Sequence, residues 1–497
     1  MAKKKVVMIG AGLAGLAGAA LLARNGSEVT VVEQLDSPGG VAGRHTEAGF
    51  TFDTGPSWYL MNGVYERFFG LFGKKPADYY DLVKLEPSYR IFFGDGTTAD
   101  VTTDPQATEA LFERLEPEGG KKIRRFLKNS ALKYRIAVDR FIYREYRSML
   151  PFLNPALLFS GLRLDIFSKL DSFVGRYFKD PRSRQIVEFN TVFLGSSPYR
   201  TPALFSLMAH ADITEGVSFP RGGVYELVKA LHALCLEQGV RFKFKTPVEK
   251  IVIEKGRAAG VATSAGFIPA DVVVAGTDYH HADTALVDDR YRNYSARYWK
   301  TRVIAPATFL ILLGLDRPVP GLAHHNFYFA SDWKRHFDSI FDRPSWPDDP
   351  SYYVGVVSKT APAMAPAGGE NLFILVPVAP GLPDTDAIRA SFSRAIISHV
   401  SKVIGVPLEK HIAVKKIIAH RDFEETLHYY KGTGLGLSHT LFQTALFRPA
   451  RRHRRVKNLY YTGHYTQPGI GMPMAVIGSE LLAARVTREM GLGRGGG

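Results

Sequence analysis

The chain has 497 residues, of which 45% are hydrophobic and 22% charged, as in ordinary folded soluble proteins. Its formal net charge of +15 suits contact with an anionic surface, nucleic acid or phospholipid headgroups, although a solvated basic surface explains the charge equally well. Nucleic-acid binding has no other support, because the sequence contains no recognisable nucleic-acid module and no aromatic platform.

The N-terminal stretch MAKKKVVMIGAGLAGLAGAALLA has the basic start, apolar run and small residues of a secretory signal peptide. Its glycines argue against that interpretation, because Gly10, Gly12 and Gly15 have G-x-G-x-x-G spacing between a β-type run and a helical run. A second β-type run, EVTVVE, follows. Residues 1–33 are therefore predicted to form a βαβ unit of the mature protein.

Each part of this unit meets a physical requirement of a dinucleotide site. Gly10 allows a tight turn, Gly12 lets the backbone approach a pyrophosphate, and Gly15 permits close packing of helix on sheet. The helix N-terminus, at Ala14, faces the negative charge. Glu33 ends the second strand, where a carboxylate can accept hydrogen bonds from ribose hydroxyls.

A second glycine cluster follows in SPGGVAGRHTEAGFTFDTGPSWYL, residues 37–60, and an NAD-dehydrogenase unit does not need it. This stretch resembles the flavin-containing amine oxidase and carotenoid desaturase superfamily. The resemblance implies FAD, with the cluster along the cofactor, an arginine at the pyrophosphate and the Asp-x-Gly-Pro turn near the flavin ring. The cofactor-binding positions it implies are Gly40, Arg44, Gly55, Pro56 and Ser57.

The central block 219–276 is predicted to form a helix, a strand, a hairpin and another strand. In the superfamily this block is the second part of the FAD domain, and the backbone of Val248 approaches the adenine. Cys235 lies in an apolar helical pattern of this block and is predicted to be a buried thiol. As the single cysteine it excludes an intrachain disulfide, and it suggests a reducing compartment.

Two basic segments suggest contact with a membrane. Residues 146–170 combine large apolar side chains with cations, which is typical of a helical pair on a membrane surface, with core packing as the alternative. Residues 448–455, RPARRHRR, are either a headgroup contact or a solvated loop. No apolar run reaches the roughly 20 residues that span a bilayer, so a soluble or peripheral protein is predicted.

The stretch YYTGHYTQPGIGMPMAVIGSE, residues 460–480, is predicted to form a strand end, a Gly/Pro loop and a helix. In the superfamily this part of the chain returns to the N-terminal domain, where the helix dipole stabilises negative charge on the flavin. The resemblance places Gly463, Gly471 and Met472 beside the isoalloxazine.

Residues 193–231, 350–384 and 441–473 resemble the bacterial-type phytoene desaturases, in the same order along nearly the whole chain. The resemblance implies FAD-dependent desaturation of phytoene toward lycopene or a related product, with hydride transfer to the flavin and loss of a proton. His464 and Ala361 depart from the commonest family pattern and leave the identity of the carotenoid open. The alternatives are a desaturase or isomerase of a C30 or modified C40 carotenoid, a retinol saturase-like enzyme, or a non-catalytic isoprenoid-binding protein similar to the Rab GDP-dissociation inhibitors.

The sequence contains no evident carboxylate pair, nucleophile–base pair or metal-ligand cluster, as expected when a substrate without polar groups is selected by tunnel shape. A surface ion pair or a packing role is the alternative for every candidate proton acceptor. The candidates are Asp139, Arg140 and His464, followed by Arg144, Asp212 and Glu215. Because only one G-x-G-x-x-G is present, a quinone or O2 is the predicted electron acceptor.

These features predict an α/β protein with a Rossmann-type, glutathione-reductase-like FAD-binding domain, a discontinuous mixed β/α substrate domain and a helical membrane-associating insert. The FAD-binding parts are predicted at 1–75, 206–284 and 431–497, the substrate domain at 76–104 and 285–430, and the insert at 105–205. The expected partners are a hydrophobic carotenoid and an anionic membrane surface on its cytoplasmic side. An oligomer is compatible with this prediction.

Overall fold

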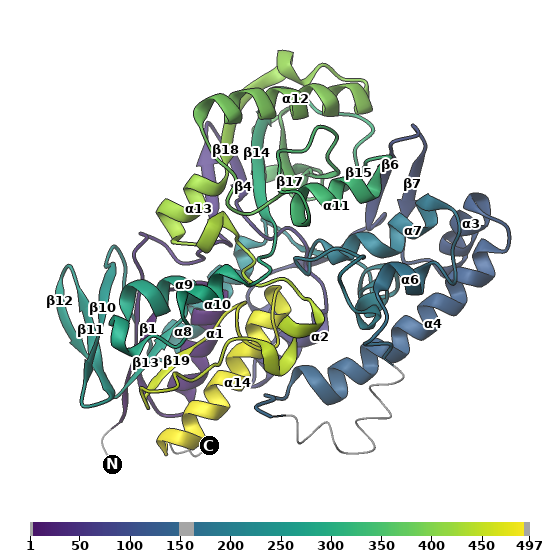
Figure 1. Ribbon diagram of the computed structural model, residues 1–497. Coiled ribbons are helices and arrows are strands. Elements are labelled where there is room, and N and C mark those ends of the chain that lie inside the picture. The colour runs from purple at the N-terminus through teal and green to yellow at the C-terminus, as the bar shows by residue number, and fades with distance from the viewer. Residues whose placement is uncertain (1–2, 149–163, 492–497) are drawn as a thin grey trace.

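In the computed structural model, which describes residues 3–148 and 164–491, a five-stranded sheet gathers strands from three distant stretches of the chain (Figure 1). The strand order is β19-β13-β1-β2-β9, and every pairing is parallel. The carboxyl ends of parallel strands meet at one edge, which is where ligands bind in such sheets. The strands are β1 (Lys5–Ile9), β2 (Glu28–Val32), β9 (Arg241–Lys243), β13 (Val272–Ala275) and β19 (Leu459–Tyr461).

Three helices pack together against this sheet: α1 (Leu13–Arg24), α8 (Tyr225–Glu237) and α14 (Met472–Met490). Ser479 of α14 donates a hydrogen bond to the Ala14 carbonyl of α1 at 2.8 Å. On another side of α1, the fully buried thiol of Cys235 lies 3.2 Å from the Leu16 carbonyl. The structure therefore confirms the predicted βαβ unit, the helix after Gly471 and the buried cysteine.

A seven-stranded mixed sheet forms the other half of the molecule, in the order β18-β14-β17-β16-β15-β6-β7 (Figure 1). Helix α12 (Asp386–Ile404) covers one face, where Ile396, Ile397 and Val400 pack against side chains of β14. The strands are β6 (Tyr89–Phe93), β7 (Thr98–Val101), β14 (Ala307–Leu315), β15 (His325–Phe329), β16 (Tyr352–Gly355), β17 (Glu370–Val378) and β18 (Ile412–Ile418).

Smaller β units surround the two main sheets. The predicted hairpin after α8 is present as part of a three-stranded antiparallel sheet, in which β11 lies between β10 and β12. Two antiparallel pairs, β3–β4 and β5–β8, stand apart from it. Their bounds are β3 (Arg44–Glu47), β4 (Phe50–Asp53), β5 (Leu82–Lys84), β8 (Ser218–Pro220), β10 (Val248–Glu254), β11 (Arg257–Thr263) and β12 (Gly266–Pro269).

A helical insert lies beside the two halves (Figure 1). It contains α3 (Pro105–Leu115), α4 (Gly119–Ala137), the π-helical turn Val138–Ile142, α6 (Leu170–Val174) and α7 (Pro181–Glu188). Most of the predicted membrane segment 146–170 lies outside the described residues. Within the described ranges, no helix combines the length and the apolar character needed to cross a bilayer. The remaining α-helices of the described residues are α2 (Asn62–Gly70), α9 (Tyr279–His281), α10 (Ala296–Lys300), α11 (Trp333–Phe341) and α13 (His420–Leu427).

One buried carboxylate joins β4 to the start of α8. Asp53 accepts hydrogen bonds from the backbone N–H groups of Val224 at 2.7 Å and Tyr225 at 3.1 Å. Gly223 permits this approach, because a Cβ there would lie 2.7 Å from an Asp53 carboxylate oxygen. Burial raises the pKa of Asp53 to about 6, against the opposing effect of the two N–H groups. Asp53 thus caps α8, which has no capping side chain of its own.

We expect Asp53→Asn to lower the free energy of unfolding by about 1–3 kcal/mol at pH 7.5, because an amide cannot accept both hydrogen bonds and leaves one N–H unsatisfied. Urea denaturation measures the change. Asp81→Asn is the matched control, because Asp81 forms an exposed ion pair with Arg221 at 2.8 Å and is expected to stay within about 0.5 kcal/mol. Equal losses in the two variants would contradict the capping role.

Candidate functional site

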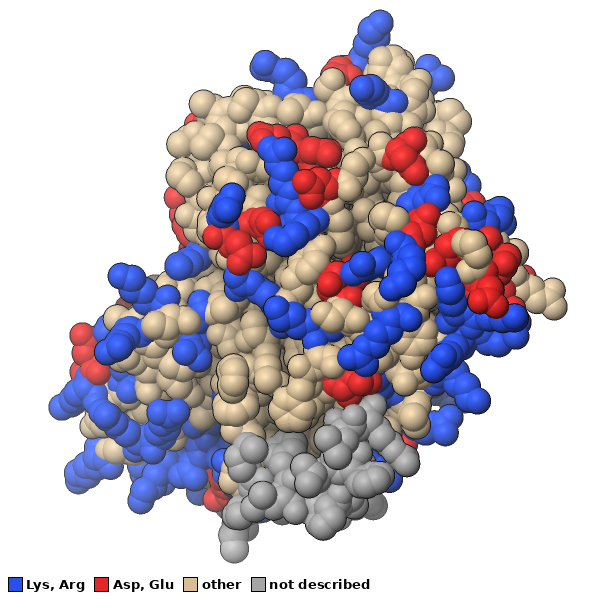
Figure 2. Space-filling model, turned by 45° about the vertical axis from the view of Figure 1, so that its right-hand side comes forward, with Lys and Arg blue, Asp and Glu red and all other residues tan. Residues whose placement is uncertain are grey.

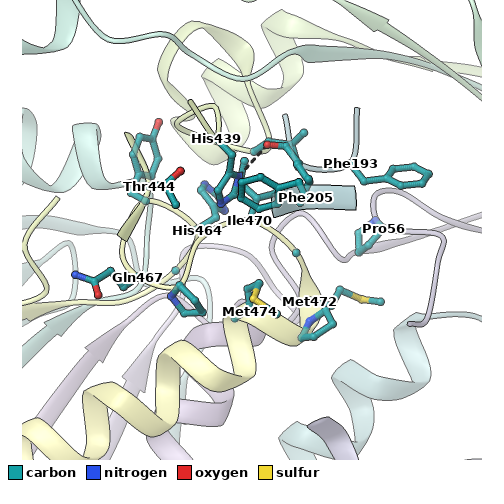
Figure 3. Close-up of a pocket in the computed structure, with 18 of the residues that line it drawn as sticks. Pro56, Phe193, Phe205, His439, Thr444, His464, Gln467, Ile470, Met472 and Met474 are labelled. Carbon is teal, nitrogen blue, oxygen red and sulfur yellow. Dashed lines mark hydrogen bonds between the residues drawn. The ribbon is translucent and has the colours of Figure 1, made fainter. Parts of the chain in front are cut away.

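A cavity of about 740 Å³ lies at the carboxyl edge of the parallel sheet, bounded by both sheets and the insert (Figure 3). Gly12, Gly276 and Gly463, which follow β1, β13 and β19, all line it. No Asp, Glu or Lys of the described residues contributes to the lining, and Arg144 is its only arginine. The rest of the wall is largely aliphatic and aromatic, as in sites for apolar ligands. It includes Phe141, Ile142, Phe193, Phe205, Leu207 and Met208.

The first glycine turn forms an open cradle at one end of this cavity. Gly15 must be glycine, because a Cβ would lie 2.1 Å from the Gly10 carbonyl oxygen. At Gly12 the nearest atom to an added Cβ is 3.9 Å away. Gly12 is the N-cap of α1 and provides no capping side chain, so the first N–H groups of the helix are available to an anion at the cavity.

The C-terminal loop supplies a second open backbone surface. Gly463 and Gly471 have φ angles of +107° and +115°, which side chains rarely adopt, and both line the cavity. No atom lies within 4 Å of a Cβ built on Gly463. Helix α14 begins at Met472 without a capping side chain, so a second helix N-terminus meets this cavity.

The structure brings most of the predicted cofactor positions together. Eight of them line the cavity: Gly12, Ala14, Gly55, Pro56, Ser57, Gly463, Gly471 and Met472. Four others are not part of the lining: Gly10 precedes α1, Gly15 lies within α1, and Glu33 and Gly40 lie between β2 and β3. Glu33 supports the turn, because its carboxylate accepts hydrogen bonds from Ala11 N at 2.7 Å and Leu35 N at 2.9 Å.

Two predicted cofactor residues lie away from the lining. Arg44 donates to the Gly222 carbonyl at 2.7 Å and to Glu226 at 3.0 Å, and its guanidinium lies over the Tyr225 ring. Val248 begins β10, where it is half-buried. Contact of these two residues with the cofactor stays a prediction.

The predicted proton acceptors separate into two groups. Asp139 and Arg140 lie on the exposed side of the π-helical turn, whereas Val138, Phe141 and Ile142 of that turn line the cavity. Asp212 is fully buried but lies outside the lining, where it accepts hydrogen bonds from Tyr89 and Asn190. Glu215 is exposed. Only Arg144 and His464 reach the cavity wall.

Two histidines face the cavity, His464 and His439, and sequence reasoning had missed the second (Figure 3). His439 donates from Nδ1 to the Leu194 carbonyl at 2.9 Å, and burial lowers its pKa to about 3. His464 Nε2 has no hydrogen-bond partner in the described structure. Burial, and then the charge of Arg448, lower the pKa of His464 to about 4. Both imidazoles are therefore neutral at pH 7.

The interpretation of residues 448–455 as a headgroup contact or a solvated loop is wrong for two of its five arginines and for its histidine. Arg448, Arg451 and His453 are buried. Arg448 donates hydrogen bonds to backbone carbonyls of the loops around the cavity, and Arg451 donates to carbonyls of the loop before α14 and of α14 itself. A run of basic residues in a sequence does not reveal such partners, because any residue type can supply a carbonyl.

The chain is similar along most of its length to known proteins. The model of the family described as flavin containing amine oxidoreductase matches residues 13–487. The chain belongs to this family. It is 41% identical to a carotenoid 3,4-desaturase of Haloarcula japonica, over 98% of each chain. It is 35% identical to a zeta-carotene-forming phytoene desaturase of Myxococcus xanthus, over 97% of this chain and 94% of that one. An oxidoreductase structure from Methanosarcina mazei shares the fold, with a TM-score of 0.64, 19% identity and coverage of 97% and 100%.

The cofactor of this family member is FAD, and the residues present fit it. The cradle at Gly12 and the N-terminus of α1 suit a pyrophosphate. The open backbone at Gly463 and Gly471, together with the α14 N-terminus, suits a flat ring that gains negative charge on reduction.

We expect Gly12→Ala to lower FAD affinity at least tenfold, about 1.4 kcal/mol, with little change in the melting temperature of the apoprotein. The added methyl group meets no protein atom closer than 3.9 Å, but it occupies the space that a pyrophosphate needs. FAD titration followed by fluorescence measures the affinity. Gly63→Ala, where an added Cβ also meets nothing within 4 Å, is the control. Unchanged affinity in Gly12→Ala would remove the cofactor from this turn.

Proposed function

We propose that the protein is an FAD-dependent carotenoid desaturase, with phytoene as the first substrate to test. The observation that carries this proposal is the cavity, which joins the flavin-binding loops to a wall to which none of the described acidic residues or lysines contributes. A C40 hydrocarbon has no group for an ion pair or a hydrogen bond, so shape and apolar contact select it. The desaturase names of two relatives support the same substrate class.

In the proposed reaction, two hydrogens leave a –CH2–CH2– unit next to a double bond. One leaves as a hydride with both electrons of its C–H bond, and FAD, when bound, supplies the acceptor for it. The other leaves as a proton, and its C–H electrons form the new double bond. The protein must therefore hold the chain in place, exclude water and provide a proton acceptor in an apolar cavity.

We assign the proton to the imidazole of His464, because only Arg144 and His464 of the predicted acceptors line the cavity, and an arginine stays protonated at neutral pH. Loss of the hydride leaves the carbon chain electron-poor and its neighbouring C–H strongly acidic, so a weakly basic imidazole suffices. The groups that face His464 are Arg448, Tyr429 and Tyr465. Asp139 and Arg140 have no part in this step, because they are exposed outside the lining.

We expect His464→Gln to slow single-turnover desaturation about 100-fold, within the usual range for a lost general base, without loss of bound FAD. Because the imidazole accepts a proton only when neutral, the wild-type rate is expected to fall as the pH drops through about 4, not through 6.5. Rates of polyene formation across pH measure both effects. His232→Gln, half-buried on α8, is the control. A His464→Gln rate within twofold of wild type would contradict this role.

The mouth of the cavity is the proposed membrane contact. Phe167, Phe442 and Phe447 are 78%, 69% and 43% exposed, and all three also line the cavity. Large aromatic side chains at an opening suit entry into a lipid interface. The net charge of +15 favours an anionic surface, and Lys and Arg are abundant on the face that Figure 2 shows. We therefore propose a peripheral position on the cytoplasmic side of the membrane, with a quinone or O2 as electron acceptor.

We expect the double variant Phe442→Ser and Phe447→Ser to bind phosphatidylglycerol vesicles on the order of tenfold more weakly, because two aromatic side chains no longer leave water. Vesicle co-sedimentation measures binding, and FAD content reports on folding. Phe267→Ser is the matched control, since Phe267 is 52% exposed on β12 and does not line the cavity. Equal weakening in control and double variant would contradict a localised contact.

The direct test is chromatography of products after FAD-loaded protein is incubated with phytoene in anionic liposomes that contain a quinone. New conjugated polyenes support phytoene desaturation, and the length of the chromophore counts the steps. Desaturation at C3–C4 is the second candidate, favoured by the 41% identity to the haloarchaeal relative. Lycopene is therefore offered in parallel, and a product from lycopene alone would replace the first candidate. No product from either, with a reducible flavin, would overturn the proposal.

A further inference from the structure

Arg448 is a buried cation that pairs with none of the described carboxylates. Only 4% of its surface is exposed. Its Nη1 donates to the Gln443 carbonyl at 3.0 Å, and its Nε donates to the Tyr465 carbonyl at 3.2 Å. Its Nη2 donates to the carbonyls of Leu437 and His464. All four partners are neutral backbone groups, so the positive charge is solvated by dipoles but not neutralised.

These four carbonyls belong to the two loops that meet at the flavin end of the cavity. Leu437 and Gln443 lie in the loop that carries His439, and His464 and Tyr465 lie in the loop before α14 (Figure 3). One planar guanidinium therefore fixes the two loops against each other. Its charge lies directly behind the wall that His464 forms.

Arg451, three positions further on, provides an internal comparison. It is 2% exposed and donates to the carbonyls of Gly478 and Gln467, so it supports the same C-terminal loop. Unlike Arg448, it lies 3.7 Å from a carboxylate oxygen of Glu145, which also pairs with Arg485 at 2.7 Å. Of these two buried arginines, only Arg448 lacks an acid.

No titratable group that faces Arg448 offsets its positive charge at neutral pH. Burial lowers the pKa of Arg448 to about 10, which leaves it charged. The neighbouring His439 and His464 are neutral, because burial lowers their pKa values to about 3 and about 4. The phenols of Tyr298 and Tyr465, which also face it, have raised pKa values and carry no charge. The groups that face Arg448 therefore leave its positive charge uncompensated, and the buried carboxyl group of Asp278 interacts with Tyr465 and not with Arg448.

We propose that Arg448 is a positioning residue whose unpaired charge favours the reduced form of the bound flavin over the oxidised form. A hydride brings two electrons and one proton, so the cofactor gains one negative charge when the substrate C–H bond is oxidised. That negative charge is the counter-charge that Arg448 lacks in the protein alone. The proposal depends on the flavin of the family and not on the carotenoid substrate.

The test is the midpoint potential of FAD bound to wild type, Arg448→Met and Arg451→Met, measured by slow reduction with a reference dye and without carotenoid. We expect Arg448→Met to weaken the binding of reduced relative to oxidised flavin about tenfold, which lowers a two-electron potential by about 30 mV. Arg451→Met removes an equally buried arginine from the same loop and is expected to change that ratio less than threefold.

Two further variants separate charge from loop support. Arg448→Lys keeps the charge but loses the planar fork, so the potential is expected to stay near wild type while FAD affinity falls. Arg448→Gln keeps a hydrogen-bond donor without charge, and it is expected to lower the potential by about 30 mV. This variant serves as the test of the charge if Arg448→Met retains no FAD. A wild-type potential in Arg448→Gln, or an equal shift in Arg451→Met, would overturn the proposal. Because no carotenoid is present, neither outcome depends on the proposed substrate.

Discussion

The site depends on the packing of α14 against α1, through which residues 459–490 join the N-terminal βαβ unit. The pairing of β19 with β13 and of β13 with β1 aligns three strand ends at one edge. The hydrogen bond from Ser479 to Ala14 then ties the third turn of α14 to the first turn of α1. As a result two uncapped helix N-termini and the glycine turns before them face one cavity. Neither part of the chain could form this cofactor site by itself.

An apolar substrate requires the rest of the cavity wall to be apolar as well. A wall of aliphatic and aromatic side chains can hold a polyene, but it offers few groups that move protons or stabilise charge. The polar groups that the site does use therefore lie at the wall or behind it: two neutral imidazoles at the wall, and behind it a charged guanidinium solvated by carbonyls. The cofactor carries the oxidation, and the protein orients it and sets the field around it.

Sequence patterns predicted the parts of the fold that local chemistry determines. The role of Gly15 could be predicted because no other residue fits beneath the Gly10 carbonyl. The loop before α14 could be predicted from its glycines and proline. His439 was missed because its neighbours form no motif, and only the tertiary fold brings it to the cavity. Arg448 was misread as part of a surface-type basic run because its partners are backbone carbonyls, which residues of any type can supply and which therefore leave no signal in the sequence. The exposure of Asp139 likewise follows from the orientation of a π-helical turn, which residue spacing does not reveal.

The central claim is that one cavity brings a carotenoid chain directly to the flavin. Anaerobic mixing of the FAD-loaded protein with carotenoid in liposomes, without any electron acceptor, tests it most directly. We expect the flavin absorption to be bleached in one turnover and one new double bond to appear for each flavin reduced. A flavin that stays oxidised while it remains reducible by dithionite, with both phytoene and lycopene supplied, would contradict direct contact between the carotenoid and the flavin.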